Sequence, residues 1–199
     1  STAPDAFDET DREHLDILAK TAAAALDRVQ REQVLSRLHA ATRDLLSADT
    51  PEGIAERTVE AARDVLGYPN TLVRLRSAET GRLEPVAASE SVRRDAGSRP
   101  AYRVGEGTAG TAFERGEPAV FDLRERDDDV DRGGAQSLLC IPLGEHGVLT
   151  IADDQPDAFD DPARRLARVL GANAESALDR IQQQRELERQ NERLDEFAN

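Results

Sequence analysis

The sequence predicts an α+β (α/β) fold, in which a central antiparallel sheet of about six strands has helices on one face and a long helix flanks it at each end of the chain. Short alternating apolar segments are joined by tight turns, the pattern of antiparallel hairpins. Apolar residues at steps of three and four near both ends indicate long helices. No apolar run reaches the ~20 residues of a membrane span, so we expect no membrane contact in this part of the protein.

The first predicted helix covers residues 8–47. Its apolar residues follow heptad spacing, take one step of six residues, and then resume, which indicates a coiled-coil seam with a local change of winding. The seam before the step is Leu15, Leu18, Ala22, Ala25 and Val29, and the seam after it is Leu35, Leu38, Thr42 and Leu45.

The start of the chain repeats its end. Residues 4–30 and 156–182 align without a gap at an offset of 152, with 13 of 27 positions identical. The offset has the length of a whole domain with a connecting helix, far longer than a solenoid repeat. Together with the absence of methionine, the repeat predicts one unit of a tandem array cut from a longer protein.

The repeat divides the chain into three predicted segments. Residues 1–32 are the tail helix of an upstream module, residues 33–181 form a domain, and residues 182–199 form a coiled-coil linker. The C-terminal helix also takes a six-residue step, from Ile181 to Leu187, after a seam of Leu170, Ala174, Ala177 and Ile181. We expect a parallel homodimer through both terminal helices. The step itself is either a switch between two packings or the point where the helix leaves the domain.

Between the long helices, turn and cap residues mark each element. Thr50 caps a helix that starts with Pro51 and ends at Gly67. Residues 90–99 are polar and expected to be flexible, and the acidic residues 123–136 are expected to be mobile. The predicted strands are 71–78, 83–89, 102–104, 119–122, 137–143 and 147–152, with a short helix at 108–115.

The charge limits the partners. Asp and Glu number 40 against 26 Lys and Arg, the net charge is −14, and Lys20 is the single lysine. A phosphate backbone needs a basic surface, so direct nucleic-acid binding is not expected. The composition resembles that of proteins from halophilic archaea; an ordinary acidic cytosolic protein is the alternative. We expect the protein to be cytoplasmic.

Residues 105–110, GEGTAG, match the G-x-G-x-x-G pattern of dinucleotide-binding loops. The context differs, because the preceding strand is short and contains Pro100, and the following helix has only about two turns. Asp122, the candidate ribose ligand, comes 12 residues after the last glycine, whereas the fingerprint places it ~20 residues on. We therefore predict a tight turn whose glycines adopt positive φ.

No other motif predicts chemistry. Cys140 is expected to be a buried small hydrophobe rather than a pigment attachment site. Three histidines are expected to be solvated: His14, His39 and His146. A cluster of four aspartates lacks the glycine and closing Glu of a calcium loop, so no metal site is predicted: Asp127, Asp128, Asp129 and Asp131. This segment is not expected to be an enzyme or to hold a cofactor.

Five motifs follow one another within residues 33–181: GEGTAG at 105–110, GEP at 116–118, SLLCIPL at 137–143, GVLTIAD at 147–153 and AFD at 158–160. In this order and spacing, residues 33–181 resemble a GAF domain. A GAF domain implies a sensory role and a cup-shaped pocket between the sheet and residues 90–131. By that resemblance the pocket wall is Arg74, Tyr102, Thr108, Phe113, Phe121, Asp122 and Leu139.

Residues 187–199 resemble the helix that enters the phosphoacceptor segment of sensor histidine kinases. The resemblance implies a GAF domain that couples a small-molecule pocket, or the upstream module, to a kinase domain in cis. Three alternatives stay open: a GAF domain of an archaeal transcriptional regulator with a helix-turn-helix output, a dimerisation module without a ligand, and a stand-alone enzyme whose turnover would need Cys140. The ligand itself is not identified by the sequence.

Overall fold

Five antiparallel strands form the centre of the computed structural model, which describes residues 9–95, 99–124 and 133–198. Their order in the sheet is β2–β1–β5–β4–β3. The strands are β1 (Asn70–Arg76), β2 (Leu83–Ala88), β3 (Ala119–Asp122), β4 (Ser137–Leu143) and β5 (Gly147–Asp153). The antiparallel sheet of the sequence prediction is confirmed, with five strands close to the predicted six.

The predicted strand at 102–104 is reduced to one bridge. Leu83 and Tyr102 exchange a single pair of backbone hydrogen bonds, of 2.8 and 3.1 Å. Pro100 has no N–H to extend the ladder on one side. On the other side the chain turns away through Gly105, which has a φ of 80°.

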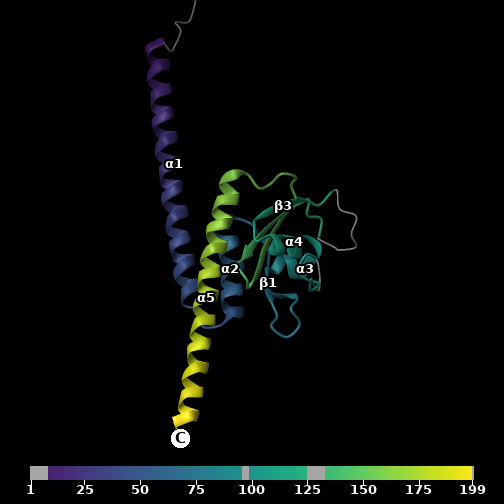
Figure 1. Ribbon diagram of the computed structural model, residues 1–199. Coiled ribbons are helices and arrows are strands. Elements are labelled where there is room, and N and C mark those ends of the chain that lie inside the picture. The colour runs from purple at the N-terminus through teal and green to yellow at the C-terminus, as the bar shows by residue number, and fades with distance from the viewer. Residues whose placement is uncertain (1–8, 96–98, 125–132, 199) are drawn as a thin grey trace, which may run out of the picture. The chain divides into compact units, whose positions relative to one another are not determined.

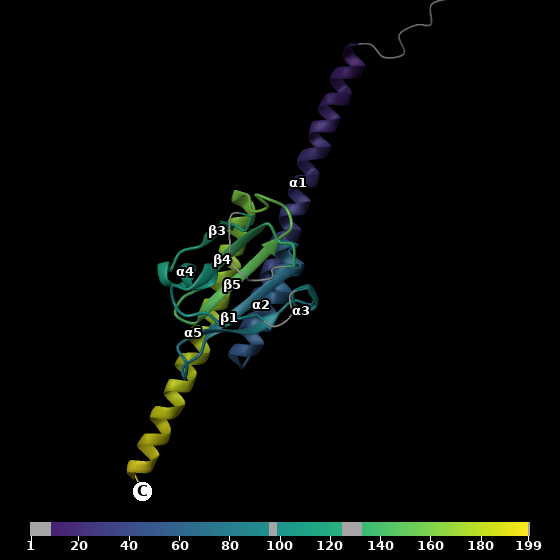
Figure 2. The same cartoon turned by 90° about the vertical axis from the view of Figure 1, so that its right-hand side faces the viewer.

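Helices cover both faces of the sheet (Figures 1 and 2). The long helices α2 (Pro51–Leu66) and α5 (Asp161–Ala198) lie on one face, as predicted. Two short helices, α3 (Glu90–Asp95) and α4 (Gly107–Arg115), lie on the opposite face, toward the viewer in Figure 2. Residues 90–95 were expected to be flexible. They form α3 because the Ser89 hydroxyl and carbonyl accept hydrogen bonds from the amides of Val92 and Arg93.

Each face has its own hydrophobic cluster. Alternation along β4 sends Leu139, Ile141 and Leu143 toward α2 and α5, and sends Leu138 and Cys140 toward α4. Cys140 is fully buried beside Ala109 and Ala112 of α4, where it packs as a small hydrophobe.

Helix α1 (Glu9–Leu46) crosses between two units, residues 1–37 and 38–199. Within the second unit, Leu38 and Leu45 of α1 are buried, and the Asn173 amide donates to the Thr42 hydroxyl at 2.8 Å. This part of the predicted seam therefore packs on its own domain. In the first unit the described seam residues are exposed.

Helix α5 changes character at Ile181. The predicted seam Leu170, Ala174, Ala177 and Ile181 is buried at 0–4% exposure in the core under the sheet. Residues 182–194 are all exposed. The assignment of this seam to a dimer interface is therefore corrected: its residues are occupied by the chain's own domain. The six-residue step coincides with the point where the helix leaves that domain.

Candidate functional site

A small cavity of about 50 Å³ lies on the face of the sheet that carries α3 and α4. Its walls come from three neighbouring strands, both short helices and the segment that precedes α4. The lining residues are Asn70, Leu72, Arg74, Val92, Arg99, Tyr102, Thr108, Leu138, Thr150 and Ala152.

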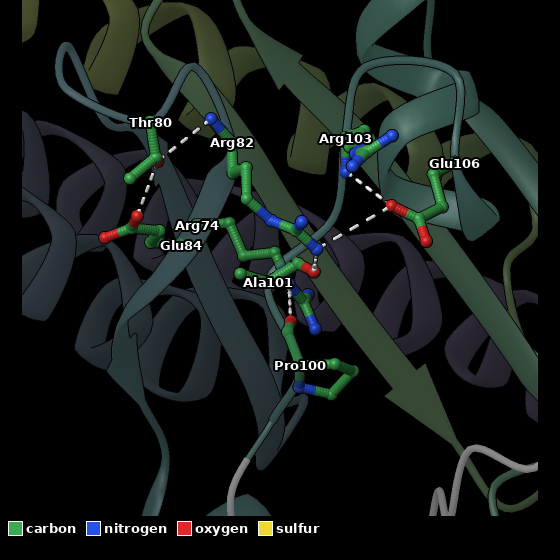
Figure 3. Close-up of polar contacts among 8 residues, drawn as sticks. All are labelled: Arg74, Thr80, Arg82, Glu84, Pro100, Ala101, Arg103 and Glu106. Carbon is green, nitrogen blue, oxygen red and sulfur yellow. Dashed lines mark hydrogen bonds and ion pairs between the residues drawn. The ribbon is translucent and has the colours of Figure 1, made fainter.

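Arg74 extends from the middle of β1 and is only 5% exposed. Its Nε donates to the Pro100 carbonyl at 3.4 Å, and its guanidinium lies 4.9 Å from the centre of the Tyr102 ring. Figure 3 shows the Arg74 side chain extending toward the segment that carries Pro100. A buried guanidinium held in this way is a fixed positive charge with several N–H donors.

The same segment is held to the sheet by a second arginine. Arg82 donates from Nη2 to the Ala101 carbonyl at 2.7 Å and lies 3.9 Å from the Glu106 carboxylate. Glu106 in turn accepts the Arg103 amide at 2.7 Å (Figure 3). These contacts fix the outer wall of the cavity against β1 and β2.

The glycine turn positions α4. Gly105 and Gly107 have φ values of 80° and 63°, which confirms the predicted tight turn. Gly110 is needed for a different reason: a Cβ there would lie 2.3 Å from the Arg103 carbonyl oxygen. The backbone of α4 therefore packs directly on the turn, and Thr108 in its first turn faces the cavity.

Two hydroxyl groups complete the polar lining. Thr150 donates to the Leu72 carbonyl at 3.0 Å, which leaves its oxygen able to accept a further hydrogen bond. Thr108 is 5% exposed, and its hydroxyl has no hydrogen bond within the described residues. Both hydroxyl groups are therefore able to hydrogen-bond a polar molecule in the cavity.

The cavity suits a small anion. Arg74 and Arg99 supply positive charge, and none of the described lining residues is Asp or Glu. Leu72, Val92 and Leu138 provide the apolar part of the lining. The volume corresponds to roughly four water-sized groups.

Three of the seven predicted wall residues meet at this cavity: Arg74, Tyr102 and Thr108. Leu139 does not, because it faces α2 and α5, and its neighbour Leu138 lines the cavity instead. Phe113 and Phe121 are half-buried in the hydrophobic cluster beneath α4.

Asp122, the remaining predicted wall residue, lies at the end of β3 outside the cavity lining. Hydrogen bonds from the Arg124 side chain and backbone hold the pKa of Asp122 below its ordinary value. Asp122 is therefore a surface partner of Arg124, and no ribose-binding role follows from its position.

The remaining lining residues were not predicted from the sequence. Asn70 and Leu72 lie on the same strand face as Arg74 and could have been found from the period of two along β1. Thr150 and Ala152 lie opposite Leu72 and Asn70 on β5, a pairing between strands almost 80 residues apart. Nothing in the local sequence indicated Arg99.

The prediction that His146 is solvated was wrong, because its side chain is only 15% exposed. Its Nε2 lies 2.6 Å from Oδ1 of Asp179, so the β4–β5 turn is connected to α5. His14 and His39 are exposed, as expected.

The described ranges contain no cluster of metal-ligating side chains, and Asp127–Asp129 and Asp131 lie outside them. Among the described helices, none is long and apolar enough to cross a bilayer.

The family is decided by a domain model that matches residues 48–179, described as GAF domain. The chain belongs to the GAF domain family. Solved structures similar to this GAF domain include that of an Acinetobacter phosphoenolpyruvate-protein phosphotransferase. It has 18% identity and a TM-score of 0.61, over 73% of this chain and 92% of that chain.

Two further similar structures come from other proteins. The GAF domain of a phosphoenolpyruvate-protein phosphotransferase from Coxiella burnetii has 18% identity and a TM-score of 0.63, over 76% of this chain and 95% of that chain. The free methionine-R-sulfoxide reductase from Neisseria meningitidis, in complex with its substrate, has 15% identity and a TM-score of 0.63, over 75% of this chain and 90% of that chain. At these identities the likeness concerns the fold. No curated protein matches the sequence.

Proposed function

We propose that this GAF domain is a non-catalytic sensory module, which couples a small anionic ligand in its cavity to the output helix α5. The observation that carries the proposal is a continuous set of contacts. Arg74 lines the cavity from β1, and Arg76, two residues on, donates its amide to the His146 carbonyl at 2.7 Å. His146 then contacts Asp179 of α5, two residues before the helix leaves the domain.

The input helix also contacts the output helix. Asn173 of α5 donates to Thr42 of α1, and Arg180 donates to the Ala48 carbonyl at 2.6 Å, just after α1 ends. The end of α1 and the β4–β5 turn therefore both contact α5. This arrangement supports a role in which α5 responds either to the cavity or to the preceding helix.

The finer proposal is a cytoplasmic GAF domain from a sensor histidine kinase of a halophilic archaeon, in a tandem array. It is supported by the acidic composition, by the repeat at an offset of 152, and by the resemblance of residues 187–199 to a kinase entry helix. A structure of a methyl-accepting chemotaxis protein is among the similar folds. The coding sequence after Asn199 separates a kinase from a helix-turn-helix regulator.

Dimerisation is assigned to the part of α5 beyond Ile181. Leu187 and Leu194 are 61% and 66% exposed, and their seven-residue spacing fits one heptad position. A parallel pair of these helices would bring the following segments of two subunits together.

One observation favours a second candidate, a GAF domain that only dimerises and transmits without a ligand. A cavity of about 50 Å³ is far below the ~300 Å³ of ordinary ligand pockets, and a few water molecules would fill it. The ligand test below decides between the two.

The test of the cavity uses acetate and its uncharged analogue acetamide, which have nearly the same shape. A ceiling of about 1.5 kcal/mol per heavy atom limits acetate, with four heavy atoms, to a dissociation constant of tens of micromolar at best. We expect calorimetric titration at constant ionic strength to detect acetate and not acetamide. Inorganic nitrate separates a general oxyanion site from a carboxylate site.

Arg74→Gln should weaken acetate binding by about 10- to 100-fold, since hydrogen bonds to charged groups contribute about 1.5–3 kcal/mol. The matched control is Arg76→Gln, an exposed arginine two residues along the same strand and outside the cavity lining. Equal binding of acetate and acetamide, or equal loss in both variants, would reject an anion site.

The dimer is tested separately, without a ligand. Leu187→Cys should form an intersubunit disulfide on mild oxidation, whereas Arg189→Cys, two positions away on the helix, should react more slowly. Cys140 is fully buried and does not compete. A monomer in light scattering at high protein concentration would reject the dimer and leave the ligand result standing.

A further inference from the structure

The repeat and the observed burial together assign a partner to the exposed face of α1. In α5, seven residues between 161 and 181 are buried against the domain: Ala167, Leu170, Gly171, Ala174, Ala177, Leu178 and Ile181. The offset of 152 places an apolar residue at every equivalent position of α1: Leu15, Leu18, Ala19, Ala22, Ala25, Leu26 and Val29. These seven α1 residues, the repeat face, are all exposed.

The outer side of α5 matches as well. Val169 is an apolar residue on the solvent side of α5, 42% exposed, and its equivalent Ile17 is 60% exposed. The charged residues Arg164 and Arg168 of α5 correspond to Arg12 and Asp16 of α1. The two helices therefore share a pattern of apolar and charged positions on both sides, although only α5 has one of its sides buried.

A coiled coil does not need this pattern. A two-helix seam uses two apolar positions per heptad, and the positions beside the seam are commonly charged. In α1 these flanking positions are Ala19 and Leu26, seven residues apart. The resulting apolar stripe has the width of a helix that packs on a core. Their equivalents Gly171 and Leu178 are buried in the domain.

Small residues support the same partner. Ala174 and Ala177 are fully buried where α5 packs in the core under the sheet, and Ala22 and Ala25 stand at the equivalent positions. Alanine permits close approach of a helix to a sheet, whereas it contributes little contact area at the seam of a coiled coil.

We infer that the repeat face of α1 packs on the sheet of a second GAF-type domain, carried by the same polypeptide before α1, in the way that α5 packs on this one. The helix would then be the output helix of one domain and the input helix of the next. The inference rests on the proposed tandem arrangement and adds to it the residues that bind the upstream domain.

The first test measures residues 1–199 alone, where the proposed occupant is missing. Leu26→Lys and the control Ile17→Lys should both leave the oligomeric state and the melting temperature unchanged. If Leu26→Lys dissociates a dimer and Ile17→Lys does not, the repeat face binds a second copy of this chain as a coiled coil, and the inference is overturned.

The second test supplies an occupant by joining residues 38–155 in front of residues 4–199, so that α1 follows the added domain at the natural spacing of the repeat. Ala19→Gly is included because a Cβ at the equivalent Gly171 would lie 2.5 Å from Ile141 Cγ2. Hydrogen exchange of residues 18–29 should slow at least tenfold relative to residues 1–199. Leu26→Lys should abolish this protection, and Ile17→Lys should keep it.

A joined protein that keeps residues 156–182 in place of 4–30 is the folding control. If the control is protected and α1 is not, or if Leu26→Lys has no effect, α1 does not pack on a GAF sheet. If the inference about α1 fails in this way, the proposed anion site and the proposed α5 dimer still stand, because neither the acetate titration nor the Leu187→Cys cross-linking involves α1.

Discussion

Replacing Gly110 by alanine perturbs the closest backbone contact around the cavity. The added Cβ would lie 2.3 Å from the Arg103 carbonyl oxygen and 3.2 Å from the Gly105 amide nitrogen. Ordinary contact begins at 3.4 Å, so α4 and the turn must separate by about 1 Å. The backbone hydrogen bond from Gly105 to the Gly110 carbonyl, 3.0 Å long, lies in the same contact.

The expected cost follows from two opposing effects. Overpacking of a close contact costs about 1–3 kcal/mol, and neither partner here is a side chain that can rotate away. Alanine gains up to about 1 kcal/mol over glycine in a helix interior. We expect a net loss on the order of 1–2 kcal/mol, and at about 2–4 °C per kcal/mol the melting temperature should fall by roughly 2–8 °C.

Circular dichroism is the suitable assay, since the chain has no tryptophan for fluorescence. The matched control is Gly53→Ala in the first turn of α2, where the nearest contacts are the Thr50 hydroxyl at 3.1 Å and the Ala48 Cβ at 3.7 Å, both side chains. This control should stay within about 0.5 kcal/mol of the wild type. If Gly110→Ala is as stable as Gly53→Ala, the contact between α4 and the turn is not as tight as described.

Three further predictions concern the rest of the domain. Burial raises the pKa of Tyr68, so its contribution to stability is present at neutral pH and is lost as the pH rises above about 10. The urea midpoint of the wild type should therefore fall at alkaline pH. Tyr68→Phe should remove this alkaline fall, although it also loses the hydrogen bond to the Ala158 carbonyl. The melting temperature should rise between 0.1 and 2 M KCl, because a net charge of −14 is screened as the Debye length falls from ~10 Å at 0.1 M to ~3 Å at 1 M; a flat or falling curve would contradict the proposed halophilic origin. One residue inserted after Gln183 rotates Leu187 by about 100° relative to the domain. If the proposed kinase output is right, this insertion should fix autophosphorylation of the full-length protein high or low, whereas seven inserted residues should restore the response. Normal output from both variants would show that residues 182–187 are a passive junction.

Local signals in the sequence predicted most of the fold. Thr50 and Pro51 start α2 where expected, with the Thr50 hydroxyl accepting the Gly53 amide, and Gly67 ends it in the left-handed conformation. The two hairpins were predicted because each pair of strands is adjacent in the sequence and is joined by a short, recognisable turn. The polar sequence of α3 has no apolar periodicity, and its helix depends on Ser89, which a search for apolar spacing does not detect.

Two errors have a common physical origin in ambiguous spacing. Residues 137–143 are apolar on both faces of β4, so the sequence did not indicate whether Leu138 or Leu139 faces the cavity. The 3.5-residue period of a coiled-coil seam and the 3.6-residue period of a straight helix drift apart by only about 20° per heptad. Over three helical turns the two patterns cannot be told apart. The buried face of α5 therefore has the spacing of a coiled-coil seam, although Leu170 to Ile181 pack on their own domain.

The central claim is that the state of the cavity reaches the exposed end of α5. Spin labels at Leu187→Cys in the proposed dimer measure the distance between the two α5 helices with and without bound acetate. We predict that acetate shifts this distance distribution, that acetamide does not, and that Arg74→Gln abolishes the shift. An unchanged distribution in protein that calorimetry shows to be saturated with acetate would contradict the coupling.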